Sequence, residues 1–102
     1  MSGPRLQVGR RVVVDTVRLA TEEVPGVLHL GHGGWRGRLA GRPIRVRVAD
    51  GRVEVRVVLV ARPAQDLVAL AGQVRAAVAA ALERLLGLEA GSITIVVDGV
   101  GS

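Results

Sequence analysis

The sequence predicts a two-layer α/β sandwich in which one mixed β-sheet carries two helices packed on one face. Three segments in the second half of the chain predict it: a β-hairpin over 44–61, a long helix over 66–86 and a last strand over 92–98. A strand, a helix and a second strand in this order are typical of a βαβ crossover, which makes the two strands parallel neighbours. The two helices then cover one face and leave an arginine-rich face open.

The hairpin is the clearest of these elements. Apolar residues alternate with arginines along its first strand, which is the period of a strand with one buried face. Asp50-Gly51 predicts a type I′ turn, because that turn requires positive φ at both central residues. A two-residue turn places Arg47 opposite Glu54. It also places Arg45 opposite Arg56, a pair of like charges whose repulsion either an anion or water would relieve.

The long helix is predicted from apolar residues that recur every three or four positions. Its expected buried stripe comprises Leu67, Leu70, Ala71, Val74, Val78, Ala81, Leu82 and Leu85. Gly87 is expected to end the helix as its C-cap. Gly72 costs helix stability relative to alanine, and we expect it to permit close approach of the first helix.

The first half of the chain adds a predicted helix over 10–24 and a short strand over 27–30. Local propensity in Val12-Val13-Val14 also favours a strand, but one apolar stripe at helical spacing favours the helix. This stripe comprises Val13, Val17, Ala20 and Val24. Pro25-Gly26 is expected to end the helix, because proline disfavours helical conformation in the residue before it.

The remaining segments are expected to be irregular or marginal. Residues 1–5 are predicted to form a flexible tail, and 6–100 a single domain that begins with a short edge strand over 6–8. A glycine-rich loop is expected over 31–43. The chain has no cysteine and no apolar run of about 20 residues, so a disulfide framework and a spanning helix are not expected. We therefore expect a soluble cytoplasmic protein, at most peripheral to a membrane.

Positive charge is concentrated in the middle of the chain. All 14 basic residues are arginine, and eight of them lie in residues 36–62 beside two acidic residues, which gives that segment a charge of +6. Such a field attracts nucleic acid, anionic lipid or an acidic partner, although arginines also solvate a sheet face. The candidate anion or partner face comprises Arg45, Arg47, Arg56, Trp35, Arg36 and Arg38.

Val58, Val60 and Val96 form a second candidate surface. Strand alternation places them on the sheet face away from the helices, where they form either an association patch or a surface covered by the loop around Trp35. The sequence offers no catalytic constellation, because no nucleophile, base and orienting group converge. His29 and His32 have no third ligand nearby in the sequence, so we expect no metal and no cofactor.

Five segments in the same order resemble the alkaline shock protein family, also called the Gls-type envelope stress response family. They are Glu23-Val24-Pro25-Gly26-Val27, the hairpin around Asp50-Gly51, Gln73-Val74-Arg75, Gly87-Leu88-Glu89 and the closing Ile93–Val100. The resemblance covers about residues 6–100. Each motif is short, so their order and spacing carry the resemblance.

The resemblance implies a small bacterial protein without catalytic activity, linked to cell-envelope stress, that tends to self-associate. Some members of the family are held at the membrane by a separate anchor protein. We therefore expect a scaffold or partner-docking module that forms a homo-oligomer and takes no small-molecule substrate. The alternative, favoured by the +6 segment and Trp35, is a nucleic-acid-binding module whose affinity falls steeply with salt.

Overall fold

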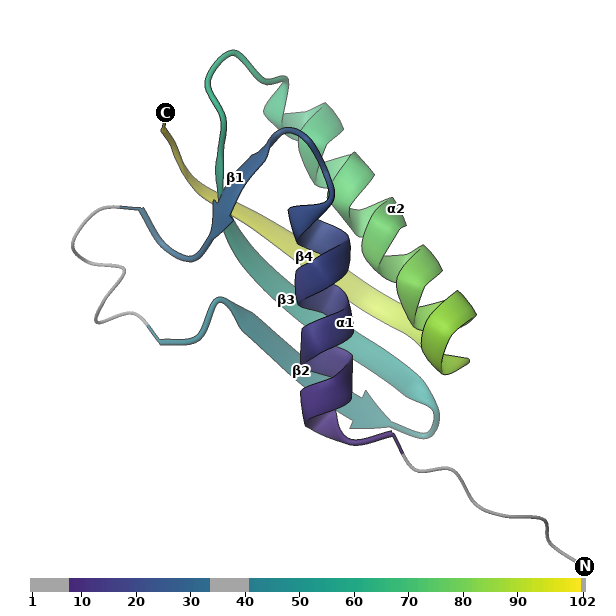
Figure 1. Cartoon of the computed structure of the whole chain (residues 1–102). Helices are drawn as coiled ribbons and strands as arrows, with labels where there is room; N and C mark the ends of the chain where they lie inside the picture. The colour runs from purple at the N-terminus through teal and green to yellow at the C-terminus, as the bar shows by residue number, and fades with distance from the viewer. Residues whose placement is uncertain (1–7, 34–40, 102) are drawn as a thin grey trace, which may run out of the picture.

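The computed structural model describes residues 8–33 and 41–101, which fold into two helices and a four-stranded sheet. The elements are α1 (Arg10–Glu22), β1 (Val27–Leu30), β2 (Ile44–Ala49), β3 (Arg52–Ala61), α2 (Leu67–Leu86) and β4 (Glu89–Val100). Both helices lie on the same face of the sheet (Figure 1). The predicted two-layer α/β sandwich is therefore confirmed.

β3 is the centre of the sheet, because each of the other three strands pairs with it. β2 and β1 pair antiparallel with successive parts of β3, β2 along 52–57 and β1 along 59–61. β4 runs parallel to β3. The sheet is therefore mixed, and the predicted βαβ crossover from β3 through α2 to β4 is confirmed.

The hairpin turn adopts the predicted geometry. Asp50 has a φ of 54° and Gly51 a φ of 74°, so both central residues lie in the left-handed region that a type I′ turn requires. The predicted register is confirmed as well, with Arg47 opposite Glu54 and Arg45 opposite Arg56. A turn of only two residues leaves the strands no freedom to slip, which is why this pairing could be read from the sequence.

α2 packs its apolar stripe between the sheet and α1. Its buried residues are Leu70, Val74, Val78, Ala81 and Leu82. Asp66 caps the N-terminus by accepting a hydrogen bond from the backbone N–H of Ala69 at 3.1 Å. At the other end Gly87 is the C-cap in the left-handed conformation, as predicted.

Three members of the predicted α2 stripe are not fully buried, and one of them, Ala71, is half-buried. Leu67 is 39% exposed and Leu85 72% exposed, because they lie in the first and last turns of the helix, where the packing surface runs out. The expectation for Gly72 is also wrong. A Cβ at this position would have no atom within 4 Å, so the glycine does not bring α1 closer.

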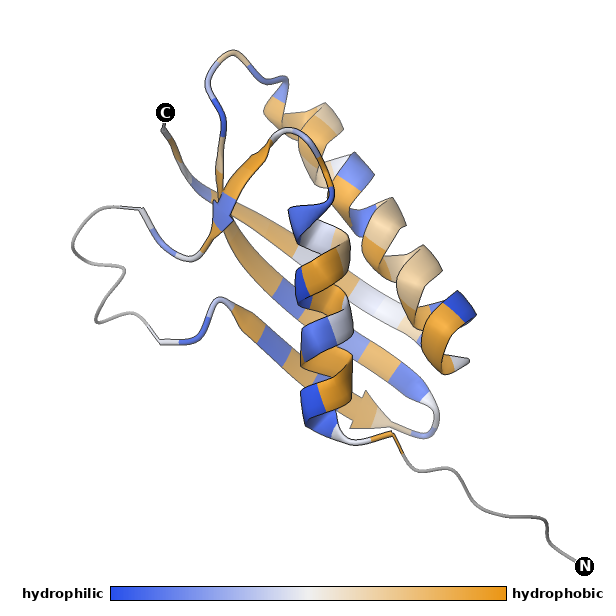
Figure 2. Ribbon diagram, in the orientation of Figure 1, coloured by the Kyte–Doolittle hydropathy of each residue, from blue (hydrophilic) through white to orange (hydrophobic). Residues whose placement is uncertain are grey.

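α1 ends at Glu22, two residues earlier than predicted, with Glu23 as its C-cap. All four residues of its predicted stripe are nevertheless buried in the hydrophobic core. Hydrophobic and hydrophilic residues alternate along the α1 ribbon (Figure 2). β4 extends beyond the predicted 92–98, because Glu89 and Val100 still pair with β3.

The predicted strand over 6–8 is not supported by Val8, which lies in no strand, while Leu6 and Gln7 lie outside the described residues. β1 confirms the predicted strand over 27–30. Of the predicted loop, 31–33 and 41–43 are irregular as expected, and 34–40 lies outside the described residues.

Two glycine-to-alanine substitutions should change stability in opposite directions. Gly51→Ala forces a side chain into positive φ and should lower the free energy of unfolding by about 1 kcal/mol. Gly72→Ala meets open space in a helix interior and should raise it by up to about 1 kcal/mol. Urea denaturation of both variants checks this, and a loss of stability in Gly72→Ala would contradict the open environment of Gly72.

Candidate anion-binding face

The basic face of the sheet consists of side chains that alternate with the core along β2 and β3. Arg45, Arg47 and Arg56 are exposed, whereas their neighbours Ile44, Val46 and Val55 are buried against the helices. The strand period therefore places all three guanidinium groups on the face away from α1 and α2.

β4 adds hydroxyl groups to the same face. In the parallel register Arg56 pairs with Thr94, so Arg45, Arg56 and Thr94 form one row across three strands. A shallow groove of about 300 Å³ runs over this region of the sheet. Its polar lining comprises Arg45, Arg47, Glu54, Arg56, Ser92 and Thr94.

The arginines of this face differ in their partners. Arg47 lies 3.8 Å from Glu54, in an ion pair whose side chains are 79% and 56% exposed. Among the described residues no carboxylate forms an ion pair with Arg45 or Arg56. The row therefore holds two opposed guanidinium groups beside a hydroxyl, and a guanidinium is suited to bidentate binding of a carboxylate or phosphate.

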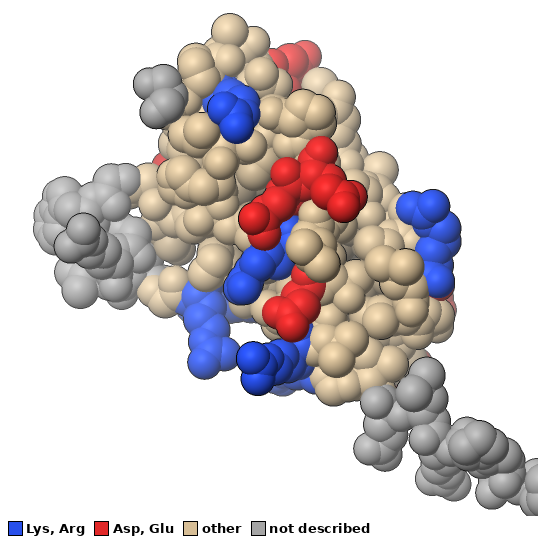
Figure 3. Space-filling view, viewed as in Figure 1, with Lys and Arg blue, Asp and Glu red and all other residues tan. Residues whose placement is uncertain are grey.

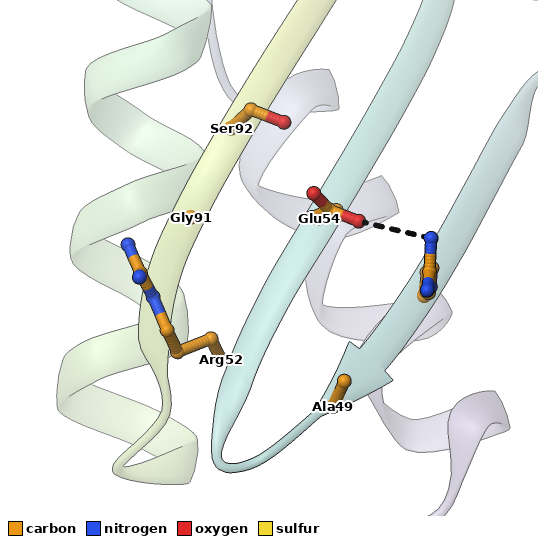
Figure 4. A pocket seen from close by; sticks show the side chains of 6 residues that line it. Ala49, Arg52, Glu54, Gly91 and Ser92 are labelled. Atoms are coloured by element: carbon orange, nitrogen blue, oxygen red, sulfur yellow. Dashed lines mark ion pairs between the residues drawn. The ribbon is translucent and has the colours of Figure 1, made fainter.

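A second groove lies on the same face at the hairpin end of the sheet and has a similar volume, about 300 Å³ (Figure 4). Arg47 and Arg52 line it, but each is within 3.8 Å of a carboxylate, that of Glu54 for Arg47 and that of Glu89 for Arg52. Because its basic groups already have partners, this groove is the weaker candidate for an anion.

The region of α1 carries a balanced charge instead. On and just after α1, Arg10, Arg11 and Arg18 are exposed together with Asp15, Glu22 and Glu23. Acidic and basic side chains lie close together over this helix (Figure 3). The excess of positive charge among these exposed groups therefore lies on the sheet face and not on α1.

The other candidate residues of the basic face, Trp35, Arg36 and Arg38, lie outside the described residues. The predicted apolar patch needs a correction. Val58 and Val60 do point away from the helices, but only 1% and 4% of their surfaces are exposed. Gly99 and Gly101, in and after β4, lie close to Val60, and the side chain of Leu28 lies close to Gly101. Val58 and Val60 therefore offer no open association surface, and the third member of the predicted patch, Val96, is half-buried.

The structure also joins two residues that the sequence analysis treated separately. Asp98 in β4 accepts hydrogen bonds from His32 Nδ1 and from the backbone N–H of Gly33, each at 3.1 Å. A carboxylate only accepts, so the imidazole carries its proton on Nδ1 in this contact. These hydrogen bonds hold the segment after β1 against β4, so His32 has a structural role. In the described part of the chain no three His, Cys, Asp or Glu side chains gather in a way that could hold a metal.

Comparison with known proteins places the chain in a wider context. The model of the alkaline shock protein family, described as having a cell envelope-related function, matches residues 3–102. A search of curated proteins finds no match.

Several solved structures share the fold. A copper form of the MamM CTD is 18% identical, with a TM-score of 0.66 over 88% of this chain and 85% of that one. A nickel form has a TM-score of 0.64 at 18% identity, over 87% of this chain and 96% of that one. At this level of identity the similarity concerns the fold alone.

Removing one of the two opposed arginines should stabilise the protein. Arg56→Thr ends the like-charge contact and keeps a good strand former, so we expect a gain of about 0.5 kcal/mol in the free energy of unfolding. Denaturation at low and high salt checks this, because screening should shrink the gain. Arg47→Thr is the control and should give no gain, since it removes an exposed ion pair. A salt-independent loss in Arg56→Thr would contradict the repulsion.

Proposed function

Because the chain belongs to the alkaline shock protein family, which has a cell envelope-related function, we propose that it is a non-enzymatic interaction protein of the envelope stress response. The family match confirms the resemblance found in the sequence. The protein acts as a self-associating scaffold that docks acidic groups, on an anionic membrane surface or on a membrane-anchored partner protein. Its place is the cytoplasm, at the inner face of the cell membrane.

The observation that carries this proposal is the row of Arg45, Arg56 and Thr94. Two guanidinium groups are held opposite each other by the hairpin register, and neither has an acidic partner in the part of the chain that the structure describes. An external carboxylate or phosphate relieves their repulsion and gains charge-assisted hydrogen bonds. Near an anionic membrane each arginine contributes about 1 kcal/mol of attraction.

The shape of the face agrees with docking to a surface. The groove over the arginines is shallow and lies on a sheet, whose exposed side chains form a broad front. Neither helix in the described residues is long and apolar enough to cross a membrane. The broad basic front supports attachment through charge, either directly to lipid or through a partner.

Binding to vesicles tests the proposal. One variant replaces three residues of the sheet face by threonine, namely Arg45, Arg47 and Arg56. A matched control replaces three exposed arginines of α1 by glutamine, namely Arg10, Arg11 and Arg18, and lowers the net charge by the same amount. Cosedimentation with vesicles containing phosphatidylglycerol should weaken by about a hundredfold in the sheet variant and much less in the helix variant.

Two results would contradict the proposal that the basic face binds the envelope surface. One is an equal loss of vesicle binding in both variants, which would show a response to net charge alone. The other is tight binding of a labelled single-stranded RNA that survives physiological salt while vesicles are ignored, which would favour the nucleic-acid module.

A further inference from the structure

The outer edge of β4 is a long unpaired strand edge. Within residues 8–33 and 41–101, β4 pairs with β3 alone, so its other edge presents backbone N–H and C=O groups that bond to no second strand. Proteins usually protect such edges with charged side chains, proline or very short strands. β4 has 12 residues and no proline, and its central stretch Ile93-Thr94-Ile95-Val96-Val97 carries no charge.

This central stretch is bounded by irregularities on both sides. The register of β4 against β3 shifts before Ile93 and again after Val97, so only the five residues between them form a regular ladder. Ile95 is the central residue of this stretch. Two identical strands that meet antiparallel at this residue place Ile95 opposite Ile95, and Ile93 opposite Val97 of the second copy.

The side chains match in this arrangement. A two-fold axis perpendicular to the sheet keeps the helices of both copies on one side, and paired residues then share a face. Ile93, Ile95 and Val97 meet their equivalents on the helical face. On the opposite face Thr94 meets Val96. No like charges are brought together along the strand.

The backbone groups are also suitably directed. Arg75 in α2 donates from Nε to the carbonyl oxygen of Ile93 at 3.2 Å. A carbonyl reached by a side chain from α2 points away from the ladder with β3, and alternate residues direct their backbone groups to the same edge. Ile93, Ile95 and Val97 therefore present their N–H and C=O groups outward, which permits six hydrogen bonds between two copies.

The flank of α2 above this edge is open. Val68 is 85% exposed, and a Cβ on Gly72 would have no atom within 4 Å. Helical spacing places Val68, Gly72 and Arg75 on one side of α2, the side from which Arg75 reaches β4. When two sheets join at β4, the two α2 helices become neighbours, and a glycine at their contact allows close approach.

We propose that a second copy of this chain adds to the β4 edge, with β4 antiparallel to β4 about Ile95, and that Arg75 restrains this association by holding the carbonyl of Ile93. This proposal rests on the proposed function and names the surface through which the protein self-associates. It shares Thr94 with the basic face but uses none of the arginines there. Failure of the β4 contact therefore leaves vesicle binding by Arg45, Arg47 and Arg56 intact, and failure of vesicle binding leaves the dimer intact.

Sedimentation velocity over a wide concentration series tests the proposal. Wild-type protein should form a dimer, and Gly72→Lys should raise the dissociation constant by at least about tenfold, because it sets two like charges at the α2 contact. Gln73→Lys is the matched control and should leave the dimer unchanged, since it adds the same charge at an exposed position about 100° further round the helix, away from β4. Arg75→Ala should tighten the dimer, because it frees the Ile93 carbonyl.

Ile95→Lys should also abolish the dimer, but this residue packs partly against the core and its loss can affect folding. Gly72→Lys avoids that difficulty, because the position is open, and circular dichroism should show its helix content unchanged. In wild type, the amide signals of Ile93, Ile95 and Val97 should shift with protein concentration in NMR spectra. A monomer at every concentration would overturn the proposal, as would a dimer weakened equally by Gly72→Lys and Gln73→Lys.

Discussion

The pairing of β3 with every other strand is the constraint on which this structure depends. From Val57 to Ala61 the residues of β3 are buried on both faces of the sheet, with exposures between 0 and 4%. Burial of each such valine or leucine side chain contributes about 1.5–3 kcal/mol. β1, β2 and β4 have no ladder other than the one with β3 among the described residues, so the sheet does not exist without this strand.

The burial of β3 also determines where charge can lie. An arginine cannot occupy a position covered on both faces without a large desolvation cost, so the charged residues of β3 lie toward the hairpin, at Arg52, Glu54 and Arg56. β2 pairs with this half of β3 and contributes Arg45 and Arg47. From Val57 to Ala61, β3 is buried on both faces of the sheet, whereas toward the hairpin only its helical face is buried. The basic face is therefore confined to the hairpin half of the sheet.

The central position of β3 leaves β4 as an outer strand. β1 and β2 pair with successive parts of β3. β4 pairs with β3 along one edge, and in the described part of the chain its other edge has no strand partner. The fold thus has two surfaces of different character, a basic face and an apolar strand edge. The proposed scaffold would bind its target through the basic face and a second copy through the strand edge, and no arginine of the basic face lies in β4.

Much of this fold could be predicted because its signals are local. The Asp50-Gly51 turn determined the hairpin register, and the spacing of valines and leucines determined the buried face of α2. What could not be predicted depends on residues far apart in sequence. The contact between His32 and Asp98 joins positions 66 residues apart, and no local sequence pattern predicts it.

The wrong predictions also concern contacts between residues that are far apart in the sequence. Leu85 follows the helical stripe but extends beyond the surface that the stripe packs on, and a period alone does not show where a neighbouring element ends. Val58 and Val60 were placed on the correct face, but the strand period does not show what covers them, such as Gly99 and Gly101 close to Val60. The candidate site was predictable at Arg45 and Arg56, where it follows from the hairpin, whereas the hydroxyl of Thr94 required the register of β4.

Native-state hydrogen exchange of dilute protein tests the central role of β3 most directly. Amides of β3 between Val57 and Ala61 that bond to neighbouring strands should exchange only through global unfolding, with protection equal to the full free energy of unfolding. Those in β1 and at the outer edge of β4 should exchange faster, through local opening. If amides of β3 exchanged through local openings while α2 stayed protected, the helices and not the central strand would hold the fold together, and this account would be wrong.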